Sequence, residues 1–320
     1  MSTAQSVAAP PVQIRVVTTD PAPYARVLPR CPGIECVGIT LPTDALRGIE
    51  APTERQRLLI GADVGPDAVL SLLGRARQQG LSAWLADGAV LEFAVLDELR
   101  HSFAGVGLEL QAGQPLRHRP MVDTVRAALR AGQLGEPAIV RIHDWRAAAG
   151  TVAVPAGWEL ISIRQYADLV CWLLEMIPET VWAIRPTVGA KRESEGPPTE
   201  TLQFHAGCPG PVMVLCDLAH GLPAGDEYWS LSVIGSRGAA YADDHRNRQL
   251  LFAAGTARAE CTREGDWPLW QLLQSFLPGR PAETTEDVVR EAPGAAALSR
   301  AIGQSLQSGA SVSLERGGLP

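Results

Sequence analysis

Short apolar runs separated by helical patterns make up the first 120 residues of the chain. The runs are rich in Val, Ile and Leu, and Gly or Pro residues bound most of them, as is typical of buried strands. Strands that alternate with helices imply a parallel sheet covered on both faces. The predicted strands are 12–17, 34–41, 57–62, 81–85 and 106–110, and the predicted helices are 21–32, 66–79 and 91–103.

After residue 120 the strands come in longer runs with few helices between them, which favours a largely antiparallel sheet. The predicted strands are 138–145, 180–186, 200–205, 212–218, 228–234 and 250–253, and the predicted helices are 122–131, 163–174, 267–276 and 286–307, the last divided at Pro293 and Gly294. We therefore expect an α/β protein with two domains. Residues 1–120 form an N-terminal Rossmann-like parallel sheet domain. Residues 121–320 form a C-terminal α+β domain with an open, mainly antiparallel sheet, whose final helix either stays there or packs back on the first domain.

The turn after the first predicted strand has the position of a dinucleotide-binding turn but not its composition. In such a turn, glycines let the backbone approach a pyrophosphate and free N–H groups bind it. Here the turn reads Thr18, Thr19, Asp20, Pro21, and Pro23 follows closely. The prolines remove two donors, and Asp20 puts a negative charge where a phosphate would lie. The turn predicts a Rossmann-like domain that has lost its cofactor.

Composition narrows the class of protein further. The chain has 320 residues, a net charge of −7 at pH 7 and six cysteines with no metal-like spacing. The negative charge and the lack of a basic stripe argue against nucleic-acid binding. No apolar run is long enough to span a membrane, and the first residues do not have the pattern of a secretory signal. We expect a cytoplasmic protein with reduced cysteines and no metal site.

Several short motifs occur in an order that resembles one known family. They are Arg117-x-x-Pro120, Gly132-Gln133-Leu134-Gly135, Ile234-Gly235-Ser236-Arg237-Gly238 and the C-terminal set Ser305, Ser308, Gly309 and Val312. The chain resembles the Gfo/Idh/MocA oxidoreductases, which include glucose-fructose oxidoreductase and inositol dehydrogenase, over most of its length. The resemblance implies the two-domain fold of that family.

The same resemblance implies where catalytic residues would lie. Active members carry Glu-Lys-Pro after the fourth strand, and Ala86, Asp87 and Gly88 occupy those positions here. They also carry Asp-x-x-x-His on a helix, where this chain has Ile161 and Gln165. The alignment therefore leaves no catalytic residue in place for proton transfer, a contribution of roughly 10²–10⁴-fold in rate.

The acidic residue that would bind a ribose is also missing, since the second strand ends in Val37-Gly38-Ile39-Thr40. Glycine turn, ribose acid, lysine and histidine all serve one hydride-transfer site. We therefore expect a catalytically inactive, oxidoreductase-like protein that binds no cofactor and acts as a binding or interaction partner. Two alternatives stay open: an NAD(P)-dependent oxidoreductase on a sugar-like or cyclic polyol substrate, with Asp87 or Asp168 handling the proton, and a small-molecule sensor that uses the former substrate cleft.

Polar residues on the predicted helix 163–174 define a candidate pocket. Arg164 and Asp168 fall on the same side of this helix, so they form either an intrahelical ion pair or part of a pocket floor for a small sugar-like ligand. Two tryptophans either form walls of the pocket, because aromatic faces pack on sugar C–H groups, or pack against the helix. The candidate pocket residues are Arg119, Trp145, Trp158, Arg164, Gln165 and Asp168.

The strands of the second domain carry apolar residues on both faces, so we expect one face to cover the helices and the other to meet a partner. In the family that the chain resembles, the open sheet face makes dimers, which implies a homo-oligomer here. The face expected to be open carries Val212, Val214, Trp229, Leu231 and Val233.

Overall fold

The structure is a computed structural model that describes residues 10–43, 52–147, 157–186, 199–223, 225–243, 248–253, 256–261, 265–278 and 285–314. The chain divides into two compact units. The first comprises Met1–Pro115 and Gly265–Thr285, and the second comprises Leu116–Glu264 and Glu286–Pro320. The chain first passes between the units close to residue 120, but it then returns to the first unit at 265–285, which a single boundary does not anticipate.

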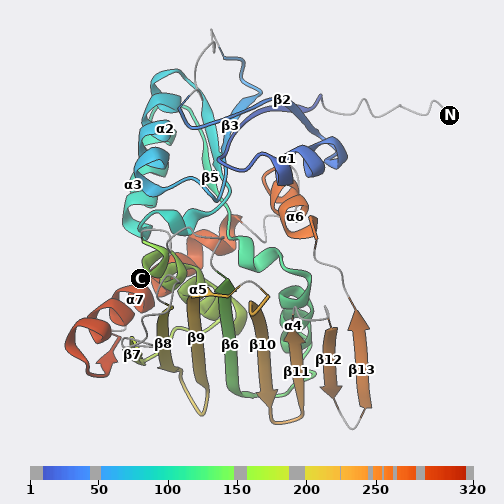
Figure 1. The fold of residues 1–320 in the computed structure, drawn as a ribbon, viewed down its shortest axis with the longest axis vertical. Coiled ribbons are helices and arrows are strands. Elements are labelled where there is room, and N and C mark those ends of the chain that lie inside the picture. The colour runs from blue at the N-terminus through green and yellow to red at the C-terminus, as the bar shows by residue number, and fades with distance from the viewer. Residues whose placement is uncertain are drawn as a thin grey trace, which may run out of the picture. The chain divides into compact units, whose positions relative to one another are not determined.

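The first unit is a Rossmann-like parallel sheet flanked by helices, as its sequence pattern predicts. The strand order is β2-β1-β3-β4-β5, and every pair is parallel. Helices α2 and α3 lie on one side of this sheet, and α1 and α6 lie on the other (Figure 1). The elements are β1 Val12–Val17, α1 Ala22–Val27, the 3-10 turn η1 Leu28–Arg30, β2 Ile34–Thr40, β3 Gln56–Ile60, α2 Pro66–Gln78, β4 Ser82–Leu85, η2 Gly88–Val90, α3 Phe93–Ala104, β5 Leu110–Ala112 and α6 Trp267–Ser275, and η3 Pro115–His118 lies at the crossing to the second unit.

Packing in the core explains why α6 belongs to the first unit. The ring of Phe276, at the end of α6, stacks on Trp84 of β4 with 5.2 Å between ring centroids. Leu272 and Leu273 are buried in the same cluster. The fit is close, since a Cβ atom on Gly113 would lie 2.3 Å from Leu272. Helix α6, rather than the final helix, therefore returns to the first unit.

The second unit is a nine-stranded sheet with the order β13-β12-β11-β10-β6-β9-β8-β7-β14. Its strand pairs are antiparallel except for β6 and β9, which run parallel, so the expectation of an open, mainly antiparallel sheet is confirmed. The elements are α4 Pro120–Arg130, β6 Pro137–Ala147, α5 Trp158–Leu174, β7 Thr180–Ile184, β8 Glu200–Gly207, β9 Met213–Leu222, β10 Tyr228–Gly235, β11 Gly238–Asp243, β12 Arg248–Ala253, β13 Thr256–Cys261, α7 Thr285–Ser308 and β14 Val312–Ser313.

Helices α4, α5 and α7 lie on one side of this sheet, and no described helix of the unit lies on the other (Figure 1). The face expected to be open was assigned wrongly. Because Val214 is paired with Val140, and Val140 with Val233, these side chains share one face, and all three are fully buried. The residues expected to meet a partner are buried within the chain itself: Val212, Val214, Trp229, Leu231 and Val233.

The exposed face carries the neighbouring positions of the same strands. A continuous row crosses six strands through successive register partners, and it includes two large exposed side chains, Trp182 and Tyr241. Met213, also exposed, lies on the same face one row away. The row is Trp182, His205, Leu215, Arg141, Ser232 and Tyr241.

Three local predictions differ from the structure. The fifth strand is Leu110–Ala112 rather than 106–110, because Gly107 has a positive φ of 74° and turns the chain before the strand begins. Helix α7 continues through Pro293 instead of being divided there. The strands β11, β13 and β14 were not predicted, since GAAYAD and TARAEC have too few β-branched residues and β14 has only two residues.

Two of the sequence motifs that carried the family resemblance lie against each other. The backbone N–H of Ser236 donates to the carbonyl of Glu136 at 2.9 Å, and that of Arg237 donates to the carbonyl of Leu134 at 3.0 Å. A Cβ atom on Gly235 would lie 2.2 Å from the Leu134 carbonyl oxygen. The glycine is required here by the close approach of two backbones.

Candidate functional site

The turn after β1 is closed by a carboxylate from the turn after β3. Asp63 accepts hydrogen bonds from the backbone N–H of Thr19 at 2.5 Å and of Asp20 at 2.7 Å. It also accepts from the hydroxyl of Thr18 at 2.8 Å and from the hydroxyl of Thr19. The N–H groups at the position of a phosphate-binding turn therefore already have an anionic acceptor that belongs to the chain.

Gly61 leaves open the space that the Asp63 carboxylate occupies. A Cβ atom on Gly61 would lie 2.4 Å from this carboxylate and 3.1 Å from the Cβ of Thr18, so a side chain there would displace the carboxylate. Loss of solvent alone would raise the pKa of Asp63. The hydrogen bonds from Thr19, Thr18 and the turn backbone outweigh that effect and lower its pKa below the ordinary value. Asp63 is therefore ionised at neutral pH.

The backbone N–H groups that follow in the turn are either hydrogen-bonded within the chain or absent. The N–H of Ala22 donates to the side chain of Asp20 at 3.1 Å, and Pro21 and Pro23 have no N–H. Helix α1 is only six residues long. Together, Asp20 and Asp63 place two carboxylates at the position of a pyrophosphate.

The Glu-Lys-Pro position after β4 is buried and structural in character. Ala86, Asp87 and Gly88 are all buried, and the Asp87 side chain accepts a hydrogen bond of 2.9 Å from the N–H of Ala89. Asp87 thus caps the 3-10 turn η2. The end of β2 contains no acidic residue either: Thr40 is its last residue, and its hydroxyl donates to the carbonyl of Val16 at 3.3 Å.

The second unit places the candidate pocket residues in separate environments. Asp168 is buried, and both of its carboxylate oxygens accept from Arg117, at 2.6 and 2.8 Å. Asp168 therefore forms its bidentate ion pair with Arg117, outside its own helix, rather than with Arg164, which was one of the two arrangements expected. Arg117 also lies over the ring of Trp172 at 5.2 Å.

Gln165, at the position of the family's histidine, is buried, and its amide oxygen accepts from Arg146 at 3.4 Å. Arg146 makes its closest contact with Asp144, at 2.6 Å. Ile161, at the position of the family's aspartate, has no titratable group. The helix face that would hold an acid or base instead carries an amide next to an internal ion pair.

A pocket of about 360 Å³ lies at the C-terminal end of β6 and the N-terminal end of β10. Two of the candidate pocket residues, Arg119 and Trp145, line it, and the Arg119 guanidinium lies 3.9 Å above the ring of Trp229. Trp158 lies elsewhere: its indole N–H donates to Glu200 and its ring packs on His220 at 5.6 Å. The pocket is lined by Leu116, Arg119, Asp144, Trp145, Arg146, Ala147, Glu227, Tyr228 and Trp229.

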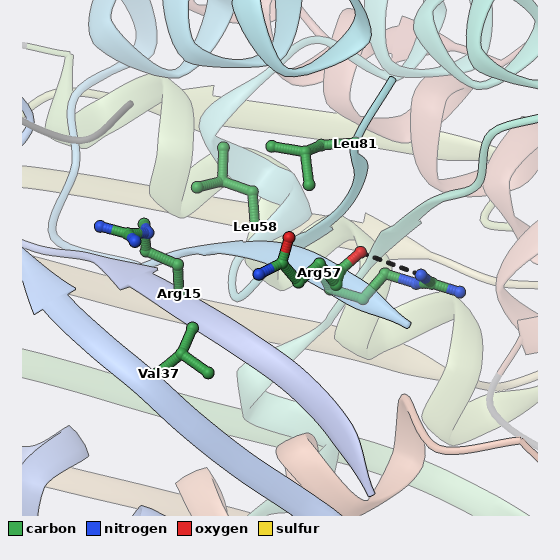
Figure 2. A pocket seen from close by; sticks show the side chains of 6 residues that line it. Arg15, Val37, Arg57, Leu58 and Leu81 are labelled. Carbon is green, nitrogen blue, oxygen red and sulfur yellow. Dashed lines mark hydrogen bonds between the residues drawn. The ribbon is translucent and has the colours of Figure 1, made fainter. Parts of the chain in front are cut away.

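A small pocket lies on the parallel sheet of the first unit (Figure 2). Arg15 and Arg57 border it, and Val37, Leu58 and Leu81 supply apolar walls. Its volume of about 10 Å³ leaves room for one water molecule at most. This pocket is a packing defect on the sheet rather than a ligand site.

Two of the groups that define these sites were missed in the sequence. Asp63 stands two residues after Gly61, at the end of an apolar strand, and an acid at that position is the signal that could have marked it. Arg117 was assigned only to a family motif, although an arginine with no nearby acid in sequence needs a distant partner when it is buried. Among the described residues, no group of His, Cys, Asp and Glu side chains is arranged to hold a metal ion.

The sequence matches no protein-family model and no curated protein sequence. Solved structures match over nearly the whole chain. The chain has the fold of the Gfo/Idh/MocA-type oxidoreductases. This confirms the family resemblance at the level of fold. None of the described helices has the length and apolar character needed to cross a membrane.

Three of the matched structures illustrate the proteins that share this fold. Myo-inositol 2-dehydrogenase from Lactobacillus plantarum is 16% identical with a TM-score of 0.68, and the match covers 95% of this chain and 100% of that one. Biliverdin reductase from Synechocystis, in complex with biliverdin and NADP+, is 13% identical with a TM-score of 0.69, over 93% and 99% of the two chains. A super-repressor mutant of Gal80p from Saccharomyces cerevisiae is 14% identical with a TM-score of 0.70, over 95% and 98%.

Proposed function

We propose that this protein has the fold of an NAD(P)-dependent oxidoreductase, carries out no hydride transfer and acts as a binding or interaction partner. The observation that carries the proposal is the Asp63 carboxylate on the N–H groups of Thr19 and Asp20. A pyrophosphate would meet two carboxylates there instead of free donors, so the residues present do not fit a dinucleotide. The existence of a Gal80p repressor with this fold supports a role outside catalysis.

The contacts of the two carboxylates that a divergent enzyme would use for proton transfer support the same proposal. Asp87 caps η2 through Ala89, and Asp168 is held by Arg117 inside the second unit. An oxidoreductase that used either carboxylate for proton transfer would have to break those contacts. This argues against the divergent enzyme and, with it, against an NAD(P) cofactor.

Titration of the purified protein with NAD(H) and NADP(H), followed by calorimetry, tests the proposal. We expect no saturable heat up to millimolar cofactor. Binding in the micromolar range would overturn the proposal, whether or not a substrate is known. The Asp63→Ser variant is the informative control, because it shows whether the wild-type result depends on the carboxylate.

A second candidate function is a sensor that binds a small neutral, hydroxylated molecule in the 360 Å³ pocket. Asp144 and Arg146 in this pocket already form an ion pair, so the site does not require a charged ligand. Trp145 and Tyr228 offer aromatic surface for the C–H groups of a sugar-like molecule. Saturable binding of a neutral polyol, weakened in Trp145→Leu, would support the sensor.

The proposal includes a homo-oligomer formed through the uncovered face of the nine-stranded sheet. Exposed Trp182, Met213 and Tyr241 on that face are the kind of side chains that interfaces cover. A different protein partner on this face is the alternative. We also propose a cytoplasmic location, since the five cysteines whose side chains the structure describes are free thiols.

A further inference from the structure

A second pocket in the second unit has a chemistry different from the first. It has a volume of about 550 Å³ and shares Trp145 and Tyr228 with the 360 Å³ pocket, and its other lining residues are Leu222, Gly225 and Asp226. We propose that this pocket binds an organic cation, a protonated alkylamine or a quaternary ammonium group. The inference does not depend on whether the chain binds a dinucleotide.

Two aromatic rings supply the main surface. Trp145 of β6 and Tyr228 of β10 are direct register partners, with 5.7 Å between ring centroids and 60° between ring planes. The ring of His143 packs edge-on against Trp145 at 5.6 Å and fixes its position. Electron-rich ring faces attract an alkylated cation, which keeps its hydrocarbon surface against the rings.

One carboxylate gives the pocket its charge. Asp226 is the only charged residue that lines it, and no residue in the described part of the chain forms an ion pair with Asp226. The backbone N–H of Asp226 donates to the carbonyl of Pro223 at 3.1 Å, so the carboxylate is carried on a hydrogen-bonded turn. An unneutralised acid beside two aromatic rings selects a cation.

The first pocket provides the internal comparison. Its lining contains Asp144, Glu227, Arg119 and Arg146, two charges of each sign, and Arg146 binds Asp144 at 2.6 Å. The second pocket contains one negative charge and no positive charge. Its volume falls within the roughly 300–1,000 Å³ of ordinary ligand sites. It can hold either a free small amine or a single cationic side chain from a partner protein.

Choline and its uncharged isostere 3,3-dimethyl-1-butanol separate cation binding from plain apolar burial. Titrations followed by calorimetry and ligand-observed NMR, at constant ionic strength, measure both. We expect choline to bind in the millimolar range and the alcohol to bind at least about fivefold more weakly. Equal binding of the two, or no binding of choline up to about 50 mM, would overturn the proposal.

Variants locate the site. Asp226→Asn is expected to weaken choline binding about fivefold, and Trp145→Leu about tenfold. Asp243→Asn, which removes a carboxylate of β11 outside the pocket lining, serves as the matched control and is expected to leave binding unchanged. An equal effect of the two aspartate variants would contradict the assignment. If Trp145→Leu does not fold, Asp226→Asn decides the question alone, since its side chain is exposed.

Peptides distinguish the source of the cation. A peptide with one trimethyllysine and the same peptide with unmodified lysine are titrated in parallel with choline. Tighter binding of a peptide than of choline, lost in Asp226→Asn, assigns the pocket to a protein partner. Binding of choline alone assigns it to a free amine.

Discussion

The Asp63 carboxylate accepts a hydrogen bond of 2.7 Å from the backbone N–H of Asp20. These two residues come from the turns after β3 and β1, whose strands are paired in parallel, so both lie at the carboxyl end of the sheet. That end is where open α/β sheets bind ligands. In this protein the donors at that edge are used to join two turns.

Replacing Asp63 is expected to destabilise the first unit. Asp63→Ala leaves the N–H groups of Thr19 and Asp20 to water, at a cost of about 1–2 kcal/mol, which is modest because Asp63 is exposed. Urea denaturation measures the loss. Asp67→Ala, in the first turn of α2, is the control and should cost about 0.5 kcal/mol. Equal losses in the two variants would contradict the bridging role of Asp63.

The stability of the wild type and that of Asp63→Asn should also depend differently on pH in the acid range. The folded-state pKa of Asp63 lies below its ordinary value of 3.8, so its contribution is complete above pH 3.8 and is lost as the pH falls further. The stability difference between the two proteins should therefore shrink below pH 3.8.

His118 predicts a second pH effect, in a higher window. Burial, assisted by the neighbouring Arg117, lowers the pKa of His118 from 6.5 to about 4. Between these values the unfolded chain binds a proton that the folded chain does not, so stability should fall as the pH drops from 6.5 towards 4, by up to about 1.4 kcal/mol per pH unit. Denaturation of wild type and His118→Gln across this range measures the effect. Parallel curves would show that His118 is not responsible.

Breaking the buried Arg117–Asp168 pair should be costly. Both side chains are less than 5% exposed, and removal of one partner leaves a buried charge. Asp168→Asn or Arg117→Met should cost about 3–5 kcal/mol, and the double variant should cost less than the sum. The control is Arg130→Met, whose side chain is 47% exposed in its pair with Glu175 and should cost less than about 1 kcal/mol. Additive losses at Arg117 and Asp168 would count against the pairing.

Gly235, where the two sequence motifs lie against each other, predicts an effect of backbone crowding. Gly235→Ala puts a Cβ atom 2.2 Å from the Leu134 carbonyl oxygen, and we expect a loss of at least about 3 kcal/mol as the two segments separate. Gly303→Ala is the matched control, since nothing lies within 4 Å of its Cβ position in α7. This substitution should stabilise the chain by about 0.5–1 kcal/mol. A small effect at Gly235 would mean that the contact is looser than described.

Charged side chains introduced on the uncovered face of the nine-stranded sheet test whether this face forms a homo-oligomer. If the protein is a homo-oligomer through this face, Trp182→Glu and Tyr241→Glu should shift it to monomers in multi-angle light scattering. Leu160→Glu, an exposed position on α5, should not change the oligomeric state. A wild-type protein that is already monomeric would remove this part of the proposal.

Much of the fold could be predicted because its causes are local. Val12–Val17 is a strand because of its β-branched run, and Pro66 opens α2 because proline suits a first helical turn. The loss of the phosphate-binding glycines was visible for the same reason, since two prolines and an acid stand where those glycines would be. The partner of that turn was not visible, because Asp63 lies 44 residues from Thr19.

The sheet of the second unit shows the same division. The two-residue period along β9 and β10 gives two sets of side chains, but it cannot say which set the helices cover, so Val214 and Val233 were placed on the wrong face. Likewise, the pattern of α6 predicts a helix, and only the packing of Phe276 on Trp84 places that helix in the first unit.

By itself, the sequence determined the kind and order of most of the elements, the two architectures and the absence of a glycine turn, because each of these follows from the properties of neighbouring residues. Tertiary structure decided that Asp63 fills the turn, that Arg117 holds Asp168, and that Trp145 and Tyr228 stand beside Asp226. Each of those contacts joins segments far apart in the chain, and it exists only because strand pairing and core packing bring the segments within hydrogen-bonding or van der Waals distance.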